Sequence, residues 1–116
     1  MSYSKYHNKK VVVDGITFDS IKESRRYSEL MLLLFAKEIS NLELQPEFEL
    51  LEAFTDAEGK KHRGILYISD FSYMDRQTKR CIVEDVKPDG NFRTEIYKLK
   101  KKLFLSKYPH LILREV

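Results

Sequence analysis

Two aspartates and a lysine stand in segments whose other residues are typical of buried strands. Asp70 lies in an apolar and aromatic run at 67–73, and Asp85 and Lys87 belong to a β-branched segment at 80–87. Aspartate is depleted in strands, and burying its charge is costly unless the carboxylate is paired or binds a metal. Because only a short polar loop separates the two segments, we expect Asp70 and Asp85 to lie close together on adjacent strands.

Two converging carboxylates beside a lysine could act on a phosphate with the help of a metal ion. Carboxylate oxygens are ligands that Mg²⁺ prefers, and the ion keeps several of its waters. A bound Mg²⁺ would polarise the phosphate and lower the pKa of a coordinated water. Lys87 could orient that water or stabilise charge that develops on the phosphate. Glu23, on a predicted helix, could add a third carboxylate.

Each of these residues also has an ordinary structural interpretation. Glu23 stands three residues after a serine, the spacing of a capping box, in which the two side chains satisfy each other's exposed amides. Lys87 could form a plain ion pair with Asp85 or Glu84 at a strand end, and Asp70 could cap a turn. The metal-site hypothesis therefore depends on all of these residues occurring together, on suitable elements.

The first elements that must position these residues are a hairpin and a helix. Residues 11–18 predict a hairpin around Asp14-Gly15, because this dipeptide tolerates the positive φ of a two-residue turn. Residues 20–37 predict a helix. Its inward face follows helical spacing and carries Glu23, Tyr27, Leu30 and Leu34.

The middle of the chain predicts extended segments separated by polar turns. They are a linker at 42–46, an extended stretch at 47–54, a turn at 55–60, a strand at 64–73, a loop at 75–79 and a strand at 80–87. On the last of these strands, alternation places Asp85 and Lys87 on one face with Val83. Glu84 then lies on the opposite face with Ile82.

The C-terminal part of the chain predicts a second helix and a final strand. Pro88 and the residues after it break the preceding strand, a helix covers about 94–107, and residues 111–116 form a strand. We expect the inward face of this helix to carry Phe92, Ile96, Leu99 and Leu103. A strand, a helix and a strand in this order imply a parallel crossover, so the chain is expected to be an α/β protein.

Composition limits the class of protein further. The chain has 116 residues, of which 42% are hydrophobic and 12% aromatic, and this composition predicts a single ordered domain over 1–116 with a flexible segment at 1–10. No apolar run is long enough for a membrane span, and from the polar N-terminus we expect no signal peptide. A lone cysteine, Cys81, fits a reducing cytoplasm.

The net charge of +3 conceals an asymmetry between the two halves of the chain. Residues 1–58 carry a net charge of −4, and residues 59–116 carry a net charge of +7. From Glu38 to Glu58, both included, there are seven acidic residues and no lysine or arginine. A basic half is a weak indication of a polyanionic partner such as nucleic acid.

Several short stretches of the sequence, in their order along the chain, resemble the PD-(D/E)XK nuclease superfamily. They resemble more closely a family of small phage and prophage proteins assigned to that fold. The matching stretches cover nearly the whole chain: residues 5–10, 14–20, 22–27, 44–46, 69–71, 83–87 and 97–104. The resemblance implies a restriction-endonuclease-like core, with a central mixed β-sheet flanked by helices in the order αβββαβ, after an N-terminal β-hairpin.

The resemblance also implies a role for each candidate residue. Asp70 and Asp85 would be metal carboxylates, Lys87 the catalytic lysine, and Glu23 the helical acid that completes the catalytic and metal site. Mg²⁺ would be the cofactor, and Mn²⁺ is expected to substitute for it. The residues expected to contact DNA are Arg25, Arg26, Gln45, Lys98, Lys101 and Lys102.

The expected function is metal-dependent endonucleolytic cleavage of DNA in the cytoplasm of a bacterial host. The basic residues would meet the phosphate backbone without reading sequence, and a core this small leaves little surface for bases. Cleavage is therefore expected to be specific for DNA structure, and the superfamily implies a homodimer where two strands are cut. The alternative is a catalytically inactive DNA-binding or packaging accessory protein of the same fold.

Overall fold

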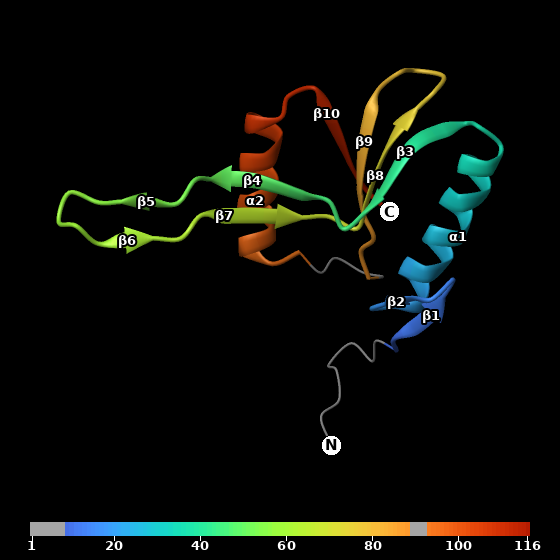
Figure 1. Cartoon of the computed structure of the whole chain (residues 1–116), viewed down its shortest axis with the longest axis horizontal. Helices are drawn as coiled ribbons and strands as arrows, with labels where there is room; N and C mark the ends of the chain where they lie inside the picture. The colour runs from blue at the N-terminus through green and yellow to red at the C-terminus, as the bar shows by residue number, and fades with distance from the viewer. Residues whose placement is uncertain (1–8, 89–92) are drawn as a thin grey trace.

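The computed structural model describes residues 9–88 and 93–116, which form a mixed α/β protein (Figure 1). A four-stranded sheet has the order β10-β9-β8-β3. The strands and the two helices around them are β3 (Ile39–Leu44), β8 (Phe71–Asp75), β9 (Cys81–Asp85), β10 (Leu111–Glu115), α1 (Ile21–Phe35) and α2 (Glu95–Lys107). Along the chain they occur as α1-β3-β8-β9-α2-β10. In the described residues, no helix is long and apolar enough to cross a membrane.

The N-terminal hairpin and the first helix agree with the prediction. β1 (Val11–Val13) pairs antiparallel with β2 (Ile16–Phe18). The turn between them has positive φ at Asp14 (54°) and Gly15 (76°), as a two-residue hairpin turn requires. Ser20 caps α1, because its hydroxyl accepts the backbone N–H of Glu23. Of the predicted flexible segment 1–10, residues 1–8 lie outside the described part of the chain.

Each face of the four-stranded sheet carries its own hydrophobic core. On the α1 side, Tyr27 and Leu30 pack with Ile82; on the α2 side, Phe104 packs with Val83. Since Ile82 and Val83 are neighbours on β9, the predicted alternation of this strand is confirmed. β9 and β10 run parallel, as expected for strands that a helix connects, and α1 and α2 lie on opposite sides of the sheet (Figure 1).

The predicted linker at 42–46 was wrong, because residues 39–44 form β3. This strand lies at the edge of the sheet and pairs antiparallel with β8. Its register shifts between Ser40 and Glu43, and Asn41 has a positive φ of 54°. The irregularity interrupts the alternation of apolar and polar residues by which a strand is identified in a sequence.

The single strand predicted at 64–73 was also wrong, because the chain breaks at Ser69 and Asp70. β7 (Ile65–Ile68) pairs with β4 (Glu47–Leu51), whereas β8 belongs to the four-stranded sheet. The N–H of Ser69 donates to the carbonyl of Pro46, and the N–H of Asp70 donates to the carbonyl of Glu84. Two adjacent residues therefore bond to different segments, and the chain passes from one sheet into another.

The inward face predicted for the second helix was wrong as well. Ile96 and Leu99 are 70% and 59% exposed, and Leu103 is 39% exposed, whereas Phe104 is fully buried. The buried face carries Tyr97 and Phe104, because these larger aromatic side chains pack against the aromatic residues of β4 and β7. Phe92 and residues 89–91, which were predicted to start this stripe and break the strand, lie outside the described residues.

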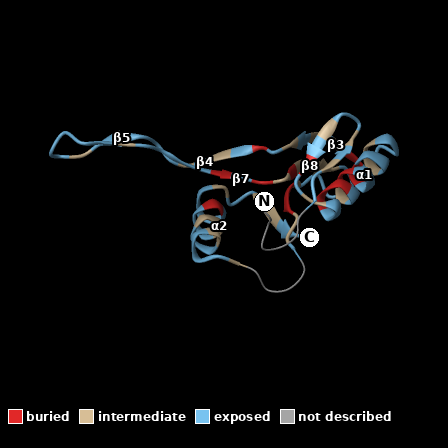
Figure 2. Cartoon of the chain, turned by 90° about the horizontal axis from the view of Figure 1, so that it is seen from below, coloured by how far each residue is buried: buried red, intermediate tan, exposed pale blue. Residues whose placement is uncertain are grey.

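A two-stranded ribbon, here called the β-arm (residues 47–68), projects from the body of the protein. It consists of β4, β7 and the shorter strands β5 (Phe54–Thr55) and β6 (Lys61–His62). Its base packs on α2 through Phe48 and Tyr67, but β5 and β6 contact no other described helix or strand. Figure 2 shows the arm exposed along most of its length. The radius of gyration is accordingly 16.6 Å, against about 13 Å for a compact domain of this length.

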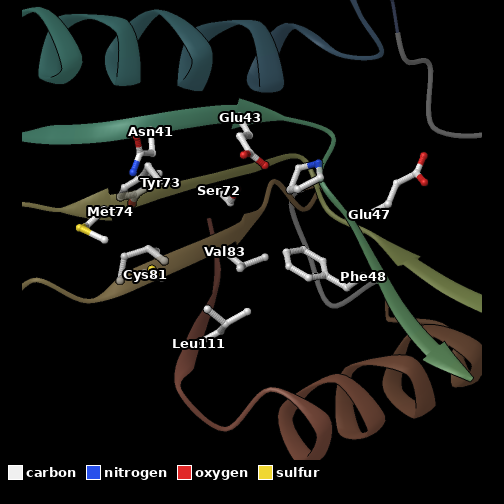
Figure 3. A pocket seen from close by; sticks show the side chains of 12 residues that line it. Asn41, Glu43, Glu47, Phe48, Ser72, Tyr73, Met74, Cys81, Val83 and Leu111 are labelled. Atoms are coloured by element: carbon white, nitrogen blue, oxygen red, sulfur yellow. The ribbon is translucent and has the colours of Figure 1, made fainter.

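A pocket of about 300 Å³ lies where the β-arm leaves the sheet (Figure 3). Met74 and Cys81, which are half-buried, and the buried Val83 line this pocket on the sheet face between β3 and α2. Phe48 forms the wall at the arm. None of the candidate residues predicted from the sequence is among the described residues that line this pocket, so the candidate site lies elsewhere.

Candidate active site

Asp70 occupies the break between β7 and β8, where the chain leaves the β-arm and enters the sheet. Its backbone N–H donates to the carbonyl oxygen of Glu84 (3.1 Å), and its Oδ2 accepts the N–H of Val86 (2.7 Å). Asp70 is therefore tied to the end of β9, where the second predicted carboxylate lies. Burial raises the pKa of Asp70, although the Val86 N–H and the Lys87 ammonium act in the opposite direction.

Glu23 reaches the same place from the first turn of α1. The residue is only 7% exposed, so it does not point to solvent. Burial, and next to it the charge of Asp70, raises the pKa of Glu23 to about 7. Glu23, Gln45 and Asp70 line one pocket of about 100 Å³. The remaining lining residues are Ile16, Thr17, Phe18 and Leu44.

Gln45 is held at this pocket by the turn between β3 and β4. It has a positive φ of 51°, and its N–H donates to the carbonyl of Asp70 (2.9 Å). The next residue, Pro46, is buried, and its carbonyl accepts the N–H of Ser69 (3.2 Å). The two points at which the chain passes between sheet and arm are thus bonded together beside the pocket.

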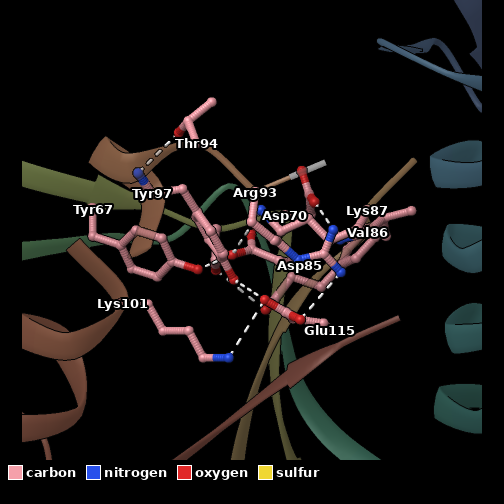
Figure 4. A network of polar contacts seen from close by, with 12 residues as sticks. Tyr67, Asp70, Asp85, Val86, Lys87, Arg93, Thr94, Tyr97, Lys101 and Glu115 are labelled. Carbon is pink, nitrogen blue, oxygen red and sulfur yellow. Dashed lines mark hydrogen bonds and ion pairs between the residues drawn. The ribbon is translucent and has the colours of Figure 1, made fainter. Parts of the chain in front are cut away.

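Asp85 and Lys87 lie next to Asp70 but face the α2 side of the sheet (Figure 4). Asp85 is 5% exposed; its Oδ2 accepts the hydroxyl of Tyr67 and lies 3.7 Å from Nζ of Lys87. Burial raises the pKa of Asp85, and the Lys87 ammonium opposes that shift. Nζ of Lys87 also lies 3.3 Å from the centre of the Tyr97 ring, a cation–π contact. Lys87 thus interacts electrostatically with Asp70 and Asp85 alike.

A polar network closes the site on the α2 side (Figure 4). The hydroxyl of Tyr97 donates to Oε2 of Glu115 (2.7 Å), which also lies 3.4 Å from Nζ of Lys101. Arg93 pairs with the other oxygen of Glu115 (3.1 Å). Although burial opposes the shift, hydrogen bonds from Tyr97 and Arg93 lower the pKa of Glu115 to about 2. Glu115 is therefore an anion that joins α2 to β10.

Sequence reasoning missed the tyrosines of this network. One signal could have found Tyr97: positions 97, 101, 104 and 108 repeat with helical spacing, and three of the four are aromatic. This second stripe competes with the aliphatic stripe of α2, and nothing in the sequence alone decides between them. Tyr67 carries no such signal, because it stands in the apolar and aromatic run at 67–73, which predicts only a buried strand.

The carboxylates of the site suit a hard cation, but they fall into two places, which the sequence did not predict. Among the described residues, no three acidic, histidine or cysteine side chains stand close enough to hold a metal ion together. Glu23 and Asp70 share a pocket, whereas Asp85 is bonded to Tyr67 and paired with Lys87. Mg²⁺ is commonly held by one or two carboxylates and several waters. Glu23 and Asp70 therefore fit it, and Gln45 adds a neutral polar group.

The cations predicted to contact DNA differ in whether they are exposed or already paired within the protein. The guanidinium of Arg26 binds both carboxylate oxygens of the fully buried Glu84 (2.8 and 2.6 Å), so it already has a partner inside the protein. Arg25 and Lys102 are exposed. Lys98 pairs with Glu95 on the outer surface of α2. Lys101 turns toward the site, where its Nζ lies 3.4 Å from Oε2 of Glu115.

The family described as "Protein of unknown function (DUF1064)" matches residues 3–116 of the chain. The match covers all of the elements described above. No curated protein and no solved structure matches the chain.

Proposed function

The chain belongs to the DUF1064 family, and from its site we propose that it is a metal-dependent DNA endonuclease. In this proposal the α1-β3-β8-β9-α2-β10 unit is a restriction-endonuclease-like core of the PD-(D/E)XK superfamily. Mg²⁺ is the cofactor, with Mn²⁺ as a substitute, and the substrate is a branched or otherwise structured DNA of phage or prophage context. The resemblance of the sequence blocks and the arrangement of the acidic residues support it.

One observation carries the proposal: Glu23 and Asp70, far apart in sequence, line the same small pocket next to Lys87. Glu23 is buried and Asp70 is half-buried. Two carboxylates in such a pocket repel each other, and the arrangement is costly unless it serves to bind a cation. A purely structural role would pair each acid with a basic side chain, as Glu84 is paired with Arg26. Instead, the charge of Asp70 raises the pKa of Glu23.

Each residue then has a definite task in phosphodiester hydrolysis. Glu23 and Asp70 would hold the cation, which when bound would supply Lewis-acid polarisation of the phosphate. The Lys87 ammonium stabilises negative charge on the phosphate oxygens. Asp85 keeps Lys87 in place and is itself held by Tyr67. To act as a metal ligand as well, Asp85 would exchange the Tyr67 hydroxyl for the cation.

A cleavage assay with matched variants tests this proposal. Purified protein is incubated with linear duplex, single-stranded, flapped and four-way-junction DNA in Mg²⁺, Mn²⁺ or EDTA. Glu23→Gln, Asp70→Asn and Lys87→Ala are each expected to reduce cleavage at least a hundredfold. Glu29→Gln on the same helix removes an exposed carboxylate (64% exposed) and is expected to leave cleavage unchanged. Cleavage that persists in EDTA, or in all three site variants, would contradict the assignment.

The alternative, a DNA-binding or packaging accessory without catalysis, is favoured by one feature of the site. The side chains of Asp85 and Lys87 already have partners within the protein, in Tyr67 and Tyr97. This alternative predicts DNA binding that is equal in Mg²⁺ and EDTA, with no cleavage of any of the four substrates. The same assay therefore separates the two functions.

A further inference from the structure

The distal part of the β-arm, residues 52–64, has no packing role in the body of the protein. β5 and β6 contact only each other among the described elements, and the residues around them are almost all exposed (Figure 2). From Leu51 to the tip the ribbon extends roughly 20 Å at about 3.3 Å per residue. Isolated two-stranded hairpins are marginally stable in water, so a projecting segment of this kind would gain stability by binding a partner.

The returning strand of the arm carries a cluster of cations without internal partners. Lys60, Lys61 and Arg63 are exposed, and none of them forms an ion pair with another described residue. By contrast, Lys98 and Lys101 of α2 are both paired with glutamates. The cations of the arm are therefore available to an external anion.

The turn at the tip of the arm, beside these cations, is ordered by hydrogen bonds and ring stacking. Oδ1 of Asp56 accepts the N–H groups of Glu58 (2.9 Å) and Lys60 (3.0 Å). Its other oxygen lies 2.8 Å from Nε2 of His62, and this hydrogen bond lowers the pKa of Asp56. The His62 ring stacks on Phe54 with their centres 4.7 Å apart. The turn is thus preorganised, and little entropy would be lost when the arm binds.

We propose that the β-arm binds duplex DNA, with its basic strand (β6 and the residues beside it) against the phosphate backbone. The ribbon has two strands about 4.8 Å apart, and the major groove, about 12 Å wide, admits a two-stranded β-ribbon. The outgoing strand and the tip carry the acids Glu52, Asp56 and Glu58, which repel phosphate. This separation of charge favours the returning strand as the edge that faces the DNA. The inference rests on the proposed function for the class of nucleic acid, and it adds a recognition element outside the catalytic pocket.

Binding measurements in EDTA test the arm separately from catalysis. Affinity for a 30-base-pair duplex is measured by fluorescence anisotropy at several salt concentrations. Lys61→Ala with Arg63→Ala is expected to weaken binding roughly tenfold at about 0.1 M salt and to reduce the slope of log K against log salt by about 1.8. The control, Arg76→Ala with Arg80→Ala, removes two exposed charges at the opposite end of the sheet and is expected to change affinity less than twofold.

A second variant removes the distal arm without disturbing the core. Leu51 and Ile65 are register partners, so replacing residues 52–64 by Asn-Gly closes the ribbon with a two-residue turn. This variant keeps Phe48 and Tyr67 against α2. It is expected to fold, as judged by circular dichroism, and to lose duplex affinity at least as strongly as the double alanine variant.

The outcomes distinguish this inference from the proposed function. Arm-dependent binding without cleavage by the wild-type protein would sink the nuclease and support the arm. Cleavage that needs Glu23 and Asp70, with wild-type affinity in both arm variants, would overturn the arm and leave the nuclease. If the shortened variant binds DNA normally but changes from dimer to monomer in analytical ultracentrifugation, the arm is an interface between two copies of the chain, and the inference is wrong.

Discussion

The pair between Arg26 and Glu84 gives the sharpest test of how this fold is held together. Glu84 is completely buried on β9, and Arg26 binds both of its carboxylate oxygens from α1. The hydroxyl of Tyr73 is a third donor to the same carboxylate, and burial together with this bond raises the pKa of Tyr73 to about 12. The substitution Arg26→Ala would leave a buried carboxylate with the tyrosine as its remaining described hydrogen-bond donor.

The expected loss of stability follows from this burial. Removing one partner of a buried, hydrogen-bonded ion pair costs about 3–5 kcal/mol, because the remaining charge is left without compensation. For a chain of this length, about 4 °C in Tm corresponds to each kcal/mol, so we expect Tm to fall by roughly 12–20 °C. The double variant Arg26→Met with Glu84→Gln removes both charges and keeps an acceptor for Tyr73. It is expected to recover at least half of the loss.

Urea unfolding followed by circular dichroism measures these free energies, and the single variants Arg26→Met and Glu84→Gln form a double-mutant cycle with the double variant. Arg25→Ala is the matched control, since Arg25 is the exposed neighbour on the same helix. A loss below 1 kcal/mol for Arg26→Ala would refute the reasoning. So would a double variant that is less stable than both single variants, because the pair would then contribute net stability beyond the penalty of an unpaired charge.

Three further predictions concern single elements. The pKa of Glu23 is about 7 in the folded protein, against 4.5 for the free side chain, so in EDTA the folded state binds more protons than the unfolded state between these two values. The free energy of unfolding should therefore fall as pH rises through this window. Glu23→Gln should abolish the fall and stabilise the protein by about 1–2 kcal/mol at pH 8, after a discount for solvent screening. Gly64→Ala would place a Cβ 2.7 Å from the carbonyl oxygen of Leu51, so β4 and β7 must move apart at this point of the β-arm. Hydrogen exchange of the β4 and β7 amides should then accelerate, and unchanged protection would contradict this prediction. Ser20→Ala removes the cap of α1 and should cost about 1 kcal/mol in thermal unfolding.

Local signals predicted the parts of the fold that depend on neighbouring residues. The hairpin follows from Asp14-Gly15, α1 from its cap and apolar spacing, and the two faces of β9 from strict alternation. The errors occurred where a long-range contact overrides the local pattern. β3 was missed because a residue with positive φ, Asn41, interrupts its periodicity. The break at 69–70 was missed because serine and aspartate there bond to segments distant in sequence.

The candidate site could be predicted in its membership more than in its geometry. Glu23 and Asp70 stood out because an acid on a buried face needs a reason, and both do line one pocket. The hydrogen bond of Asp85 with Tyr67 joins β9 to the base of the β-arm, and no pattern in one sequence encodes this contact. The fate of Arg26 was equally hidden, since a helical arginine does not reveal that a buried glutamate 58 positions later will bind it.

β9 joins these observations, because its consecutive acids serve opposite faces of the sheet. Glu84 is neutralised by Arg26 on the α1 side, and Asp85 by Lys87 on the α2 side. Asp70 is bonded between them: its N–H donates to the carbonyl of Glu84, and its carboxylate accepts the N–H of Val86. Two internal cations thus compensate the buried charges of β9. In the pocket of Glu23 and Asp70, by contrast, the charge of Asp70 raises the pKa of Glu23. Lys87 acts on Asp70 as well as on Asp85, so the pocket of Glu23 and Asp70 holds two carboxylates but shares one internal cation with β9. The charge and ligand preference of the proposed divalent cation suit that pocket.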